Sequence, residues 1–382
     1  MRRAAGVGFV VVALLVAGGL VAAFAALGGT DRLRTGDATG AAVAEACSDT
    51  PTAAQGGAAE AEASTILLSS LDAAACSLGV PREDLVLALG RGDGIEEAAR
   101  SLGVAPQALQ DAVIGSIRTA VDAEDKAGRL TPETALAIRT LLDVIPPDQL
   151  LAAVRNEQGA CDAVPWKQVD GLREVAAEVG VLTGLRAACT LRVAPLEAVA
   201  ALADPAGLAG LAARSGRSPA EVEQAVRDAM VASIEQAQQA GALTSTEGSV
   251  LGAAARVAPV DRILAIVRGD DDPCTPFPWG KADGQGQVLA EIALIGVVDA
   301  ACQLKAPTFD VFAALASPEA LTALEQSTGK SQDEIDAVLK TGIGKGVDAA
   351  TEAGAMSGLE ALILRAALSQ VGVLDLLGRL GG

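Results

Sequence analysis

Apolar residues recur at every fourth position in one long segment of the chain, and the same pattern appears three times. The first segment contains Leu109, Val113, Ile117 and Val121. Its counterparts contain Val222, Val226, Met230 and Ile234, and then Ile335, Leu339, Ile343 and Val347. A four-residue spacing places these side chains on one face of an α-helix, whereas a half-buried β-strand would show alternation. The pattern therefore predicts three long amphipathic helices and an all-α fold.

These helices belong to a longer internal repeat. Cys76, Cys189 and Cys302 lie 113 residues apart, and no insertion interrupts the register between them. The same interval separates Leu78, Leu191 and Leu304, then Gly103, Gly216 and Gly329, and also Pro165-Trp166 and Pro278-Trp279. Self-similarity at a fixed period is the signature of stacked supersecondary units. We expect three tandem copies of one helical unit, each with about six helices and no sheet.

The repeat period divides the chain into a body and two leading segments. The body comprises unit 1 at residues 63–160 (together with Cys47), unit 2 at residues 161–273 and unit 3 at residues 274–382. Residues 31–62 contain mainly Ala, Gly, Thr, Asp and Glu without apolar periodicity, which is typical of a flexible tether.

Residues 1–30 have the pattern of a membrane-directed segment. Arg2 and Arg3 precede an uncharged stretch from Ala4 to Thr30, longer than the roughly 20 apolar residues that cross a bilayer. The positive-inside rule keeps the two arginines in the cytoplasm and places the body outside. An uncleaved transmembrane signal anchor is one interpretation, and a signal peptide cleaved after Ala25 is the alternative. The first predicts a single-pass cell-membrane protein, and the second a secreted one.

A glycine turn follows each long helix. Gly128, Gly241 and Gly354 occupy the same register, and each is followed two residues later by Leu or Met and then by Thr or Ser. Glycine at this place is typical of a left-handed helix cap. The next helix is expected to begin with a capping box at Thr244 and Glu247, and likewise at Ser357 and Glu360. In the first copy, Pro132 takes the first helical position instead.

The six cysteines fit the same repeat. Cys47 and Cys76 lie 29 residues apart, whereas Cys161 and Cys189, like Cys274 and Cys302, lie 28 apart. Pairing within units uses all six cysteines, and this is the arrangement that we predict. The rival pairing of Cys76 with Cys161 and of Cys189 with Cys274 would leave two thiols over. Disulfides also suit an oxidising, extracytoplasmic compartment.

Composition excludes several kinds of site. The chain has no His, which excludes a Ser-His-Asp triad and any His-containing zinc site. Aromatic residues make up only 2% of the chain. The net charge of −19 opposes binding to nucleic acid. Asp270, Asp271 and Asp272 are the best candidates for a cation, although a solvated linker is the favoured interpretation. Trp166 and Trp279 are expected to pack on the disulfides or at the unit junctions. We predict no catalytic residues, no cofactor and no metal.

The pattern of a long helix, a Gly-x-Leu-Thr turn and a second helix resembles short helical units of uncharacterised secreted or membrane-anchored bacterial proteins. The resemblance covers less than half of each copy, and it implies a cell-envelope setting without a particular activity. Three tandem helical units usually form a binding or spacing surface rather than one active site. We therefore expect a non-enzymatic binding or structural module of the envelope, attached to the membrane and contacting an envelope protein partner. The alternative is a carrier that holds an apolar small molecule within its helical units.

Overall fold

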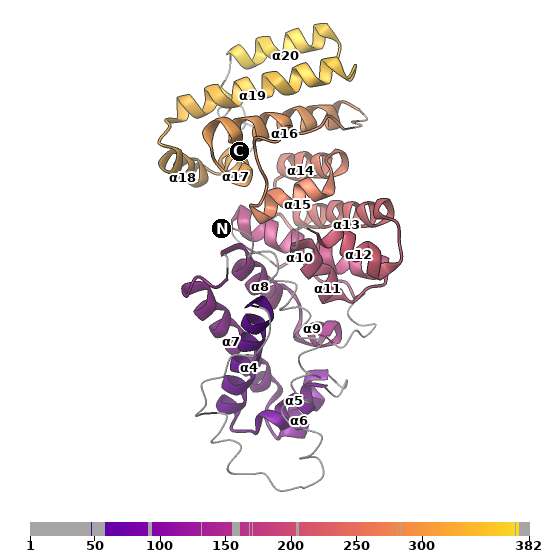
Figure 1. The fold of residues 1–382 in the computed structure, drawn as a ribbon, viewed down its shortest axis with the longest axis vertical. Coiled ribbons are helices and arrows are strands. Elements are labelled where there is room, and N and C mark those ends of the chain that lie inside the picture. Colours follow the sequence, from indigo (N-terminus) through magenta and orange to yellow (C-terminus); the bar gives the residue numbers. More distant parts are fainter. Residues whose placement is uncertain are drawn as a thin grey trace. The chain divides into compact units, whose positions relative to one another are not determined.

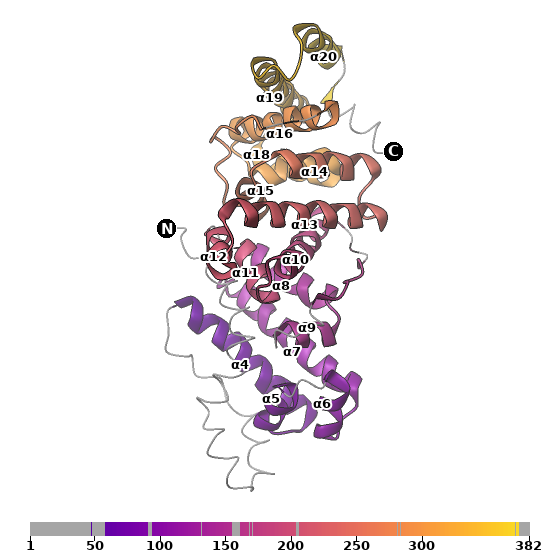
Figure 2. The same ribbon diagram turned by 90° about the vertical axis from the view of Figure 1, so that its right-hand side faces the viewer.

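The computed structural model describes Cys47 and residues 58–90, 94–130, 132–154, 161–167, 169, 171–203, 206–280, 282, 284–370 and 372–373. The expected anchor at residues 1–30 and most of the expected tether lie outside the described residues. Within the described ranges the regular structure is helical and no strand occurs, which confirms the all-α prediction. Figure 1 shows these helices, and Figure 2 shows them from a second direction.

The chain forms two compact units, each of which includes parts of α10 and α13. The first unit comprises Met1–Lys167 and Gly180–Val226, and the second comprises Gln168–Val179 and Arg227–Gly382. This division differs from the repeat boundaries, because two long helices are shared between the compact units. In the first unit lie α4 (Ala58–Leu78), α5 (Arg82–Gly90), α6 (Gly94–Leu102), α7 (Pro106–Lys126), α8 (Pro132–Val144), α9 (Pro147–Val154), α11 (Pro195–Ala203), α12 (Gly207–Ser215) and parts of α10 (Leu172–Leu191) and α13 (Pro219–Gln239).

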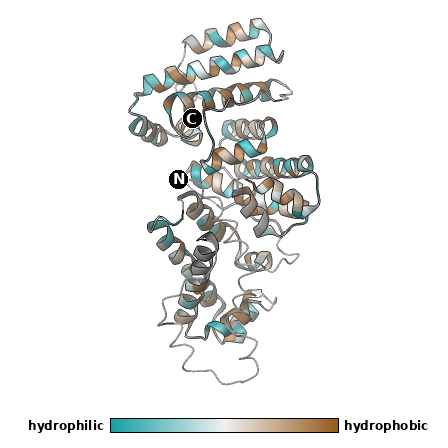
Figure 3. Cartoon of the chain, in the orientation of Figure 1, coloured by the Kyte–Doolittle hydropathy of each residue, from teal (hydrophilic) through white to brown (hydrophobic). Residues whose placement is uncertain are grey.

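The second unit contains the rest of α10 and α13, together with α14 (Ser245–Val257), α15 (Val260–Arg268), α16 (Gln285–Leu304), α17 (Thr308–Ala316), α18 (Pro318–Thr328), α19 (Gln332–Glu352) and α20 (Gly358–Gln370). Figures 1 and 2 show α16, α19 and α20 side by side, and α14 packs on α16. In Figure 3, polar and apolar residues both occur along α19, as expected for a helix with one buried face.

Helix starts recur at the period of the sequence repeat. Helices begin at Arg82, Pro195 and Thr308, then at Pro106, Pro219 and Gln332, and finally at Pro132, Ser245 and Gly358. Each set keeps the interval of 113 residues. The apolar stripe predicted for the long helix faces the core, since Leu109, Val222 and Ile335 are each fully excluded from solvent. Other stripe residues, Val113, Ile117 and Ile343, are half-buried. Periodicity in the sequence therefore identifies both the helices and their buried faces.

The first described helix begins earlier than the sequence analysis expects. Helix α4 starts at Ala58, inside the segment assigned to the tether at residues 31–62. The segment Ala58-Ala59-Glu60-Ala61-Glu62 contains only strong helix formers, although it carries no apolar stripe. Helix propensity accounts for this extension.

The glycine turn after each long helix is a Schellman motif in all three places. Gly128, Gly241 and Gly354 have φ of 68°, 77° and 71°, respectively. The amide of Arg129 donates to the Glu124 carbonyl at 3.0 Å, and the same bond recurs from Ala242 to Ala237 at 3.0 Å and from Ala355 to Ala350 at 2.9 Å. These bonds satisfy carbonyls that the helix end would otherwise leave unpaired.

The helices after these turns begin as the sequence predicts. The Thr244 hydroxyl accepts from the Glu247 amide at 3.2 Å, and the Glu247 carboxylate accepts from the Thr244 amide at 2.8 Å. Ser357 and Glu360 form the equivalent pair of bonds, at 3.3 and 2.8 Å. In the first copy α8 starts at Pro132. Both capping boxes and the proline start are therefore confirmed.

Helix α16 and α19 approach each other backbone to backbone. A Cβ atom at Gly342 would overlap the Gly296 carbonyl oxygen, and one at Gly346 would lie 2.5 Å from the Ile292 carbonyl oxygen. Real Cβ atoms do not approach an oxygen so closely. Glycine is therefore required where the two helices cross, and Gly344 on another face of α19 has open space around it.

Helix α16 is, among the described helices, the one that is long and apolar enough to cross a membrane. In the structure 61% of the apolar 18-residue stretch of this helix is buried inside the protein. It packs against α14, α17 and α19, and it contains Glu291 and Asp299. These contacts are those of a core helix.

We predict that Gly342→Ala destabilises the fold by about 1–3 kcal/mol, because the added methyl forces α16 and α19 apart. The matched control is Gly344→Ala, which should stabilise by about 0.5–1 kcal/mol, since a helical glycine is replaced in open space. Urea unfolding of both variants measures the difference. Equal effects at the two positions would show that the helices are not in close contact.

A second prediction concerns the turn after the first long helix of each copy. The left-handed residue there is Gly79 in the first copy but Arg192 and Lys305 in the others, with φ of 58° and 54°. We expect Lys305→Gly to stabilise by about 0.5–1 kcal/mol, because glycine adopts this conformation without strain. Lys305→Ala removes the same side chain but keeps the strain, so it should give no gain. Thermal unfolding measures the stability of both variants. If the alanine variant were stabilised as much as the glycine variant, the backbone strain assigned to Lys305 would be contradicted.

Candidate functional site

The cysteines form three disulfides within the predicted copies. Cys47 is bonded to Cys76, Cys161 to Cys189, and Cys274 to Cys302. No free cysteine remains in the part of the chain that the structure describes. In each pair the second cysteine lies near the C-terminal end of a long helix, α4, α10 or α16. Each bridge therefore joins the end of that helix to the segment that precedes it.

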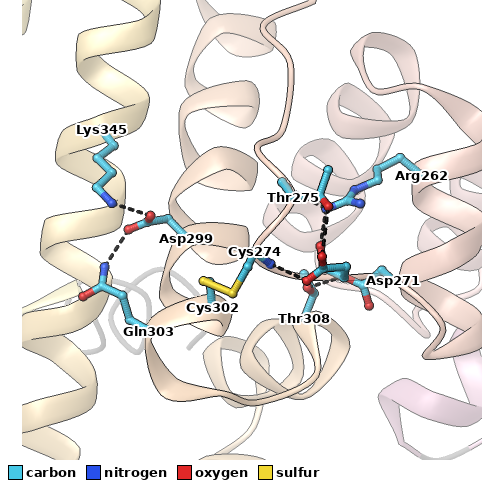
Figure 4. Close-up of a disulfide and its surroundings, with 10 residues drawn as sticks. Arg262, Asp271, Cys274, Thr275, Asp299, Cys302, Gln303, Thr308 and Lys345 are labelled. Atoms are coloured by element: carbon cyan, nitrogen blue, oxygen red, sulfur yellow. Dashed lines mark hydrogen bonds and ion pairs between the residues drawn. A yellow bond between two sulfur atoms is a disulfide. The ribbon is translucent and has the colours of Figure 1, made fainter.

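The surroundings of the third disulfide show how the preceding segment is held (Figure 4). The Asp272 carboxylate accepts from the Cys274 amide at 3.0 Å and from the Thr275 hydroxyl at 3.1 Å. The Arg262 guanidinium of α15 donates to the main-chain carbonyls of Asp272 and Thr275, each at 2.9 Å. The turn is thus fixed to α15 on one side and to α16 on the other.

The three consecutive aspartates are engaged in this structural role. Asp270 pairs with Arg268 at 3.2 Å, and Asp271 accepts from the Thr308 hydroxyl at 2.5 Å. Together with the bonds of Asp272, these contacts show that the three aspartates hold the linker in place. The described residues contain no group of three or more His, Cys, Asp or Glu side chains that is arranged to hold a metal ion.

A second polar contact braces α16 against α19. Asp299 accepts from Lys345 of α19 at 2.5 Å and from Gln303 at 2.6 Å (Figure 4). Lys345 is 58% exposed, so this ion pair lies at the protein surface and is screened by solvent. This ion pair lies at the edge of the glycine contact between the two helices and helps to fix their orientation.

Glu291 is an unusual residue in the second compact unit. It lies on the apolar helix α16, and its side chain is completely buried. One carboxylate oxygen accepts from the Gly280 amide, while Oε2 has no hydrogen-bond partner among the described residues. Burial raises the pKa of the Glu291 carboxyl, and the bond from Gly280 opposes this shift. Glu178, exactly one period earlier, is equally buried. The recurrence of Glu at positions 178 and 291, one repeat period apart within apolar segments, is a sequence signal of this buried site.

The segment that leads into α16 packs near Glu291. Trp279 lies against a cluster that contains Val288, Ile292, Val347 and Ala350, and Trp166 lies against a separate cluster in the first compact unit. Trp279 therefore packs on the helices α16 and α19. The cluster around Trp166 contains residues of the predicted first and second copies, as expected for a unit junction. Trp279 instead packs on two helices of the predicted third copy, which differs from the expected place on a disulfide or at a junction.

One pocket of about 300 Å³ lies in the first compact unit, where α4 turns into α5. It is lined by Val80, Pro81, Asp84, Leu87, Ala88, Ser101 and Leu102. Its volume is at the lower bound for a small-molecule site, and its lining includes the polar residues Asp84 and Ser101. An apolar carrier would need an enclosed apolar cavity, so this pocket gives that alternative little support.

The largest exposed apolar side chains of the described residues gather on α20. Leu359, Leu362 and Ile363 are 67%, 65% and 59% exposed, respectively. Their spacing places them on one face of the helix. The opposite face packs inward through Ala361, which is buried, and Leu364. Helix α20 thus presents an apolar stripe to solvent, which is a feature of docking surfaces.

We predict that Glu291→Gln changes the pH dependence of stability. Because the folded-state pKa is raised, the native state holds a proton that the unfolded state releases, so stability falls as the pH rises above the ordinary glutamate pKa. Glutamine removes this loss, so the variant should be more stable than the wild type at neutral pH. The difference should vanish as the pH falls to the ordinary glutamate value.

Glu360→Gln is the matched control for this pH experiment. Hydrogen bonds from Ser357 lower the pKa of the Glu360 carboxyl, so its stabilising effect is present at neutral pH and is lost on acidification. Urea unfolding across the acid-to-neutral range should therefore show opposite trends for the two variants. The same trend in both would contradict the environment assigned to Glu291.

No protein-family model, no curated protein sequence and no solved structure matches this chain. Function is therefore inferred from the repeated helices, turns and disulfides.

Proposed function

We propose that this protein is a membrane-anchored, extracytoplasmic scaffold whose body consists of three tandem helical units, and that it acts as a non-enzymatic binding or structural module of the cell envelope. One observation carries the proposal. Helix starts, glycine turns and the second cysteine of each disulfide recur together at 113-residue intervals. The repeated residues are those that hold helices together, which is the expected signature of a tandem scaffold.

The compartment is supported by the disulfides and by the leading segment. Disulfides persist in oxidising compartments outside the cytoplasm and are rare inside it. The uncharged stretch from Ala4 to Thr30, after Arg2 and Arg3, is the part of the chain proposed to hold the body at the membrane. The acidic balance of the chain suits a soluble body that does not bind nucleic acid.

Contacts between helices of successive copies support stacking of the proposed units. Helix α14, which belongs to the proposed second copy, packs on α16, the first helix of the proposed third copy. Within the first compact unit, Ile138 and Leu142 of α8 share a core cluster with Leu182 and Leu185 of α10. In both places the fifth helix of one copy meets the first helix of the next. Each copy therefore buries apolar surface that it could not bury alone.

The proposal is tested by topology and fractionation. A reporter enzyme that is active only outside the cytoplasm, fused after Gly382, should be active, and the full-length mass should be recovered from the membrane fraction. Activity only from a cytoplasmic reporter at the same position would overturn the extracytoplasmic assignment. Recovery of a soluble protein that lacks its first 25 residues would replace the anchor with a cleaved signal peptide.

A further inference from the structure

The pocket at the turn from α4 into α5 has apolar walls and one carboxylate. Its apolar part includes Val80, Leu87 and Leu102, and the carboxylate belongs to Asp84. Asp84 is exposed, and its side chain forms no hydrogen bond or ion pair with another residue of the described part of the chain. A ligand that joins a cationic group to an apolar stem is therefore complementary to this pocket, which we call the α5 pocket.

The basic side chains of α5 and α6 do not serve Asp84, because each has a carboxylate partner elsewhere. Arg82 donates to Asp72 at 2.7 Å, and Arg100 pairs with Glu97. The two helices pack against each other (Figure 1), and each carries two acidic residues and one arginine. The electrostatic potential around the pocket is therefore negative, which favours a cation.

The matching acid of α17 holds a guanidinium. Asp84 is the third residue of α5 and Asp310 is the third residue of α17, and the two are separated by twice the repeat period. The Asp310 carboxylate accepts from the Arg173 guanidinium at 2.6 Å, and the same guanidinium lies 5.7 Å from the centre of the Phe309 ring. Arg173 belongs to the first turn of α10. Within the second compact unit, an acid at this register thus accepts an arginine side chain.

The size and the polar groups of the α5 pocket favour an arginine side chain. A volume of about 300 Å³ is at the lower end for drug-sized ligands, so the pocket suits one long side chain better than a larger organic molecule. The guanidinium fork matches a carboxylate such as Asp84, and the aliphatic stem can lie on Leu87 and Leu102. The Ser101 hydroxyl donates to the Ala98 carbonyl at 2.8 Å, which leaves its oxygen able to accept another N–H.

Resting on the proposed function as a binding module, we propose that the α5 pocket binds an arginine side chain of a partner protein, with the guanidinium on Asp84 and the stem on Leu87 and Leu102. A partner with a basic surface fits better than a second copy of this chain, because two bodies of net charge −19 repel each other. The same charge attracts a basic partner from a distance, and added salt should weaken the contact.

A carboxylate in the first turn of a helix also has a purely structural role, because it complements the positive end of the helix dipole. Glu83 and Asp84 share this role in α5, but only Asp84 lines the pocket. Glu83→Gln therefore matches Asp84→Asn in its effect on the helix and leaves the pocket carboxylate in place. This pair of variants separates ligand binding from helix stability.

Titration of the full chain with a capped arginine tests the pocket directly. The probe is N-acetyl-arginine methylamide, and binding is followed by the methyl NMR signals of Leu87 and Leu102 in the detergent-solubilised protein. We expect a saturable shift of both signals, with a Kd on the order of 1 mM because one side chain makes a small contact. Asp84→Asn should weaken binding by about fivefold or more, whereas Glu83→Gln should change it by less than about twofold.

Two further probes identify the chemistry of the ligand and its source. N-acetyl-citrulline methylamide has nearly the same shape without the charge, so it should bind at least about fivefold more weakly than the arginine probe. The n-butylguanidinium ion carries the cation without a peptide main chain, and it should bind no more tightly than the capped arginine. Tighter binding of n-butylguanidinium would assign the pocket to a free organic cation instead of a protein.

The arginine site is contradicted if neither methyl signal shifts, if the citrulline probe binds as tightly as the arginine probe, or if Glu83→Gln weakens binding as much as Asp84→Asn. The comparison of the capped probes uses the wild-type chain, so it decides the question even where a variant changes the circular dichroism spectrum. The reporter and fractionation results do not depend on this pocket. Failure of the arginine site and failure of the extracytoplasmic assignment are therefore distinguishable.

Discussion

The close approach of long helices is the constraint on which the rest of this structure depends. With 2% aromatic residues, the core cannot be filled by large rings, so helices must come together until small side chains and backbone atoms touch. Gly296, Gly342 and Gly346 allow this between α16 and α19. Positions one period earlier hold Thr183, Ala229 and Ser233, which are also small and buried. Small, buried residues at these positions are therefore part of the repeated pattern, and glycine occupies all three of them in the last copy.

The disulfides and the linker bonds complement this packing. A core of alanine, valine and leucine buries less apolar area per residue than one with aromatic side chains, so covalent bridges have a clear stabilising role. Each bridge fixes the segment that leads into a long helix, and Asp272 and Arg262 hold the corresponding turn in the third copy. The same acidic residues that the sequence offers as a cation site are used as local hydrogen-bond acceptors. Their role follows from contacts that spacing alone does not specify.

Local and periodic features of the fold could be predicted, whereas features set by distant packing could not. The turns at Gly128, Gly241 and Gly354 and the boxes at Thr244 and Ser357 depend on nearby residues, so short patterns identify them. The early start of α4 at Ala58 was missed because it depends on propensity without an apolar stripe. Burial of Glu291 depends on what packs around α16, and the exposure of Leu362 depends on the absence of a covering helix among the described elements. An amphipathic helix has the same sequence pattern whether or not another helix covers the apolar residues that lie outside its core-facing stripe.

The central claim is that each proposed copy is closed by its own disulfide, and peptide mapping of the native protein tests it most directly. Digestion without reduction, followed by mass spectrometry, should yield linked peptides that join Cys161 to Cys189 and Cys274 to Cys302. The pairing requires no bridge to cross a copy boundary. Recovery of a peptide that links Cys189 to Cys274 would contradict the claim, because the covalent unit would then span two copies.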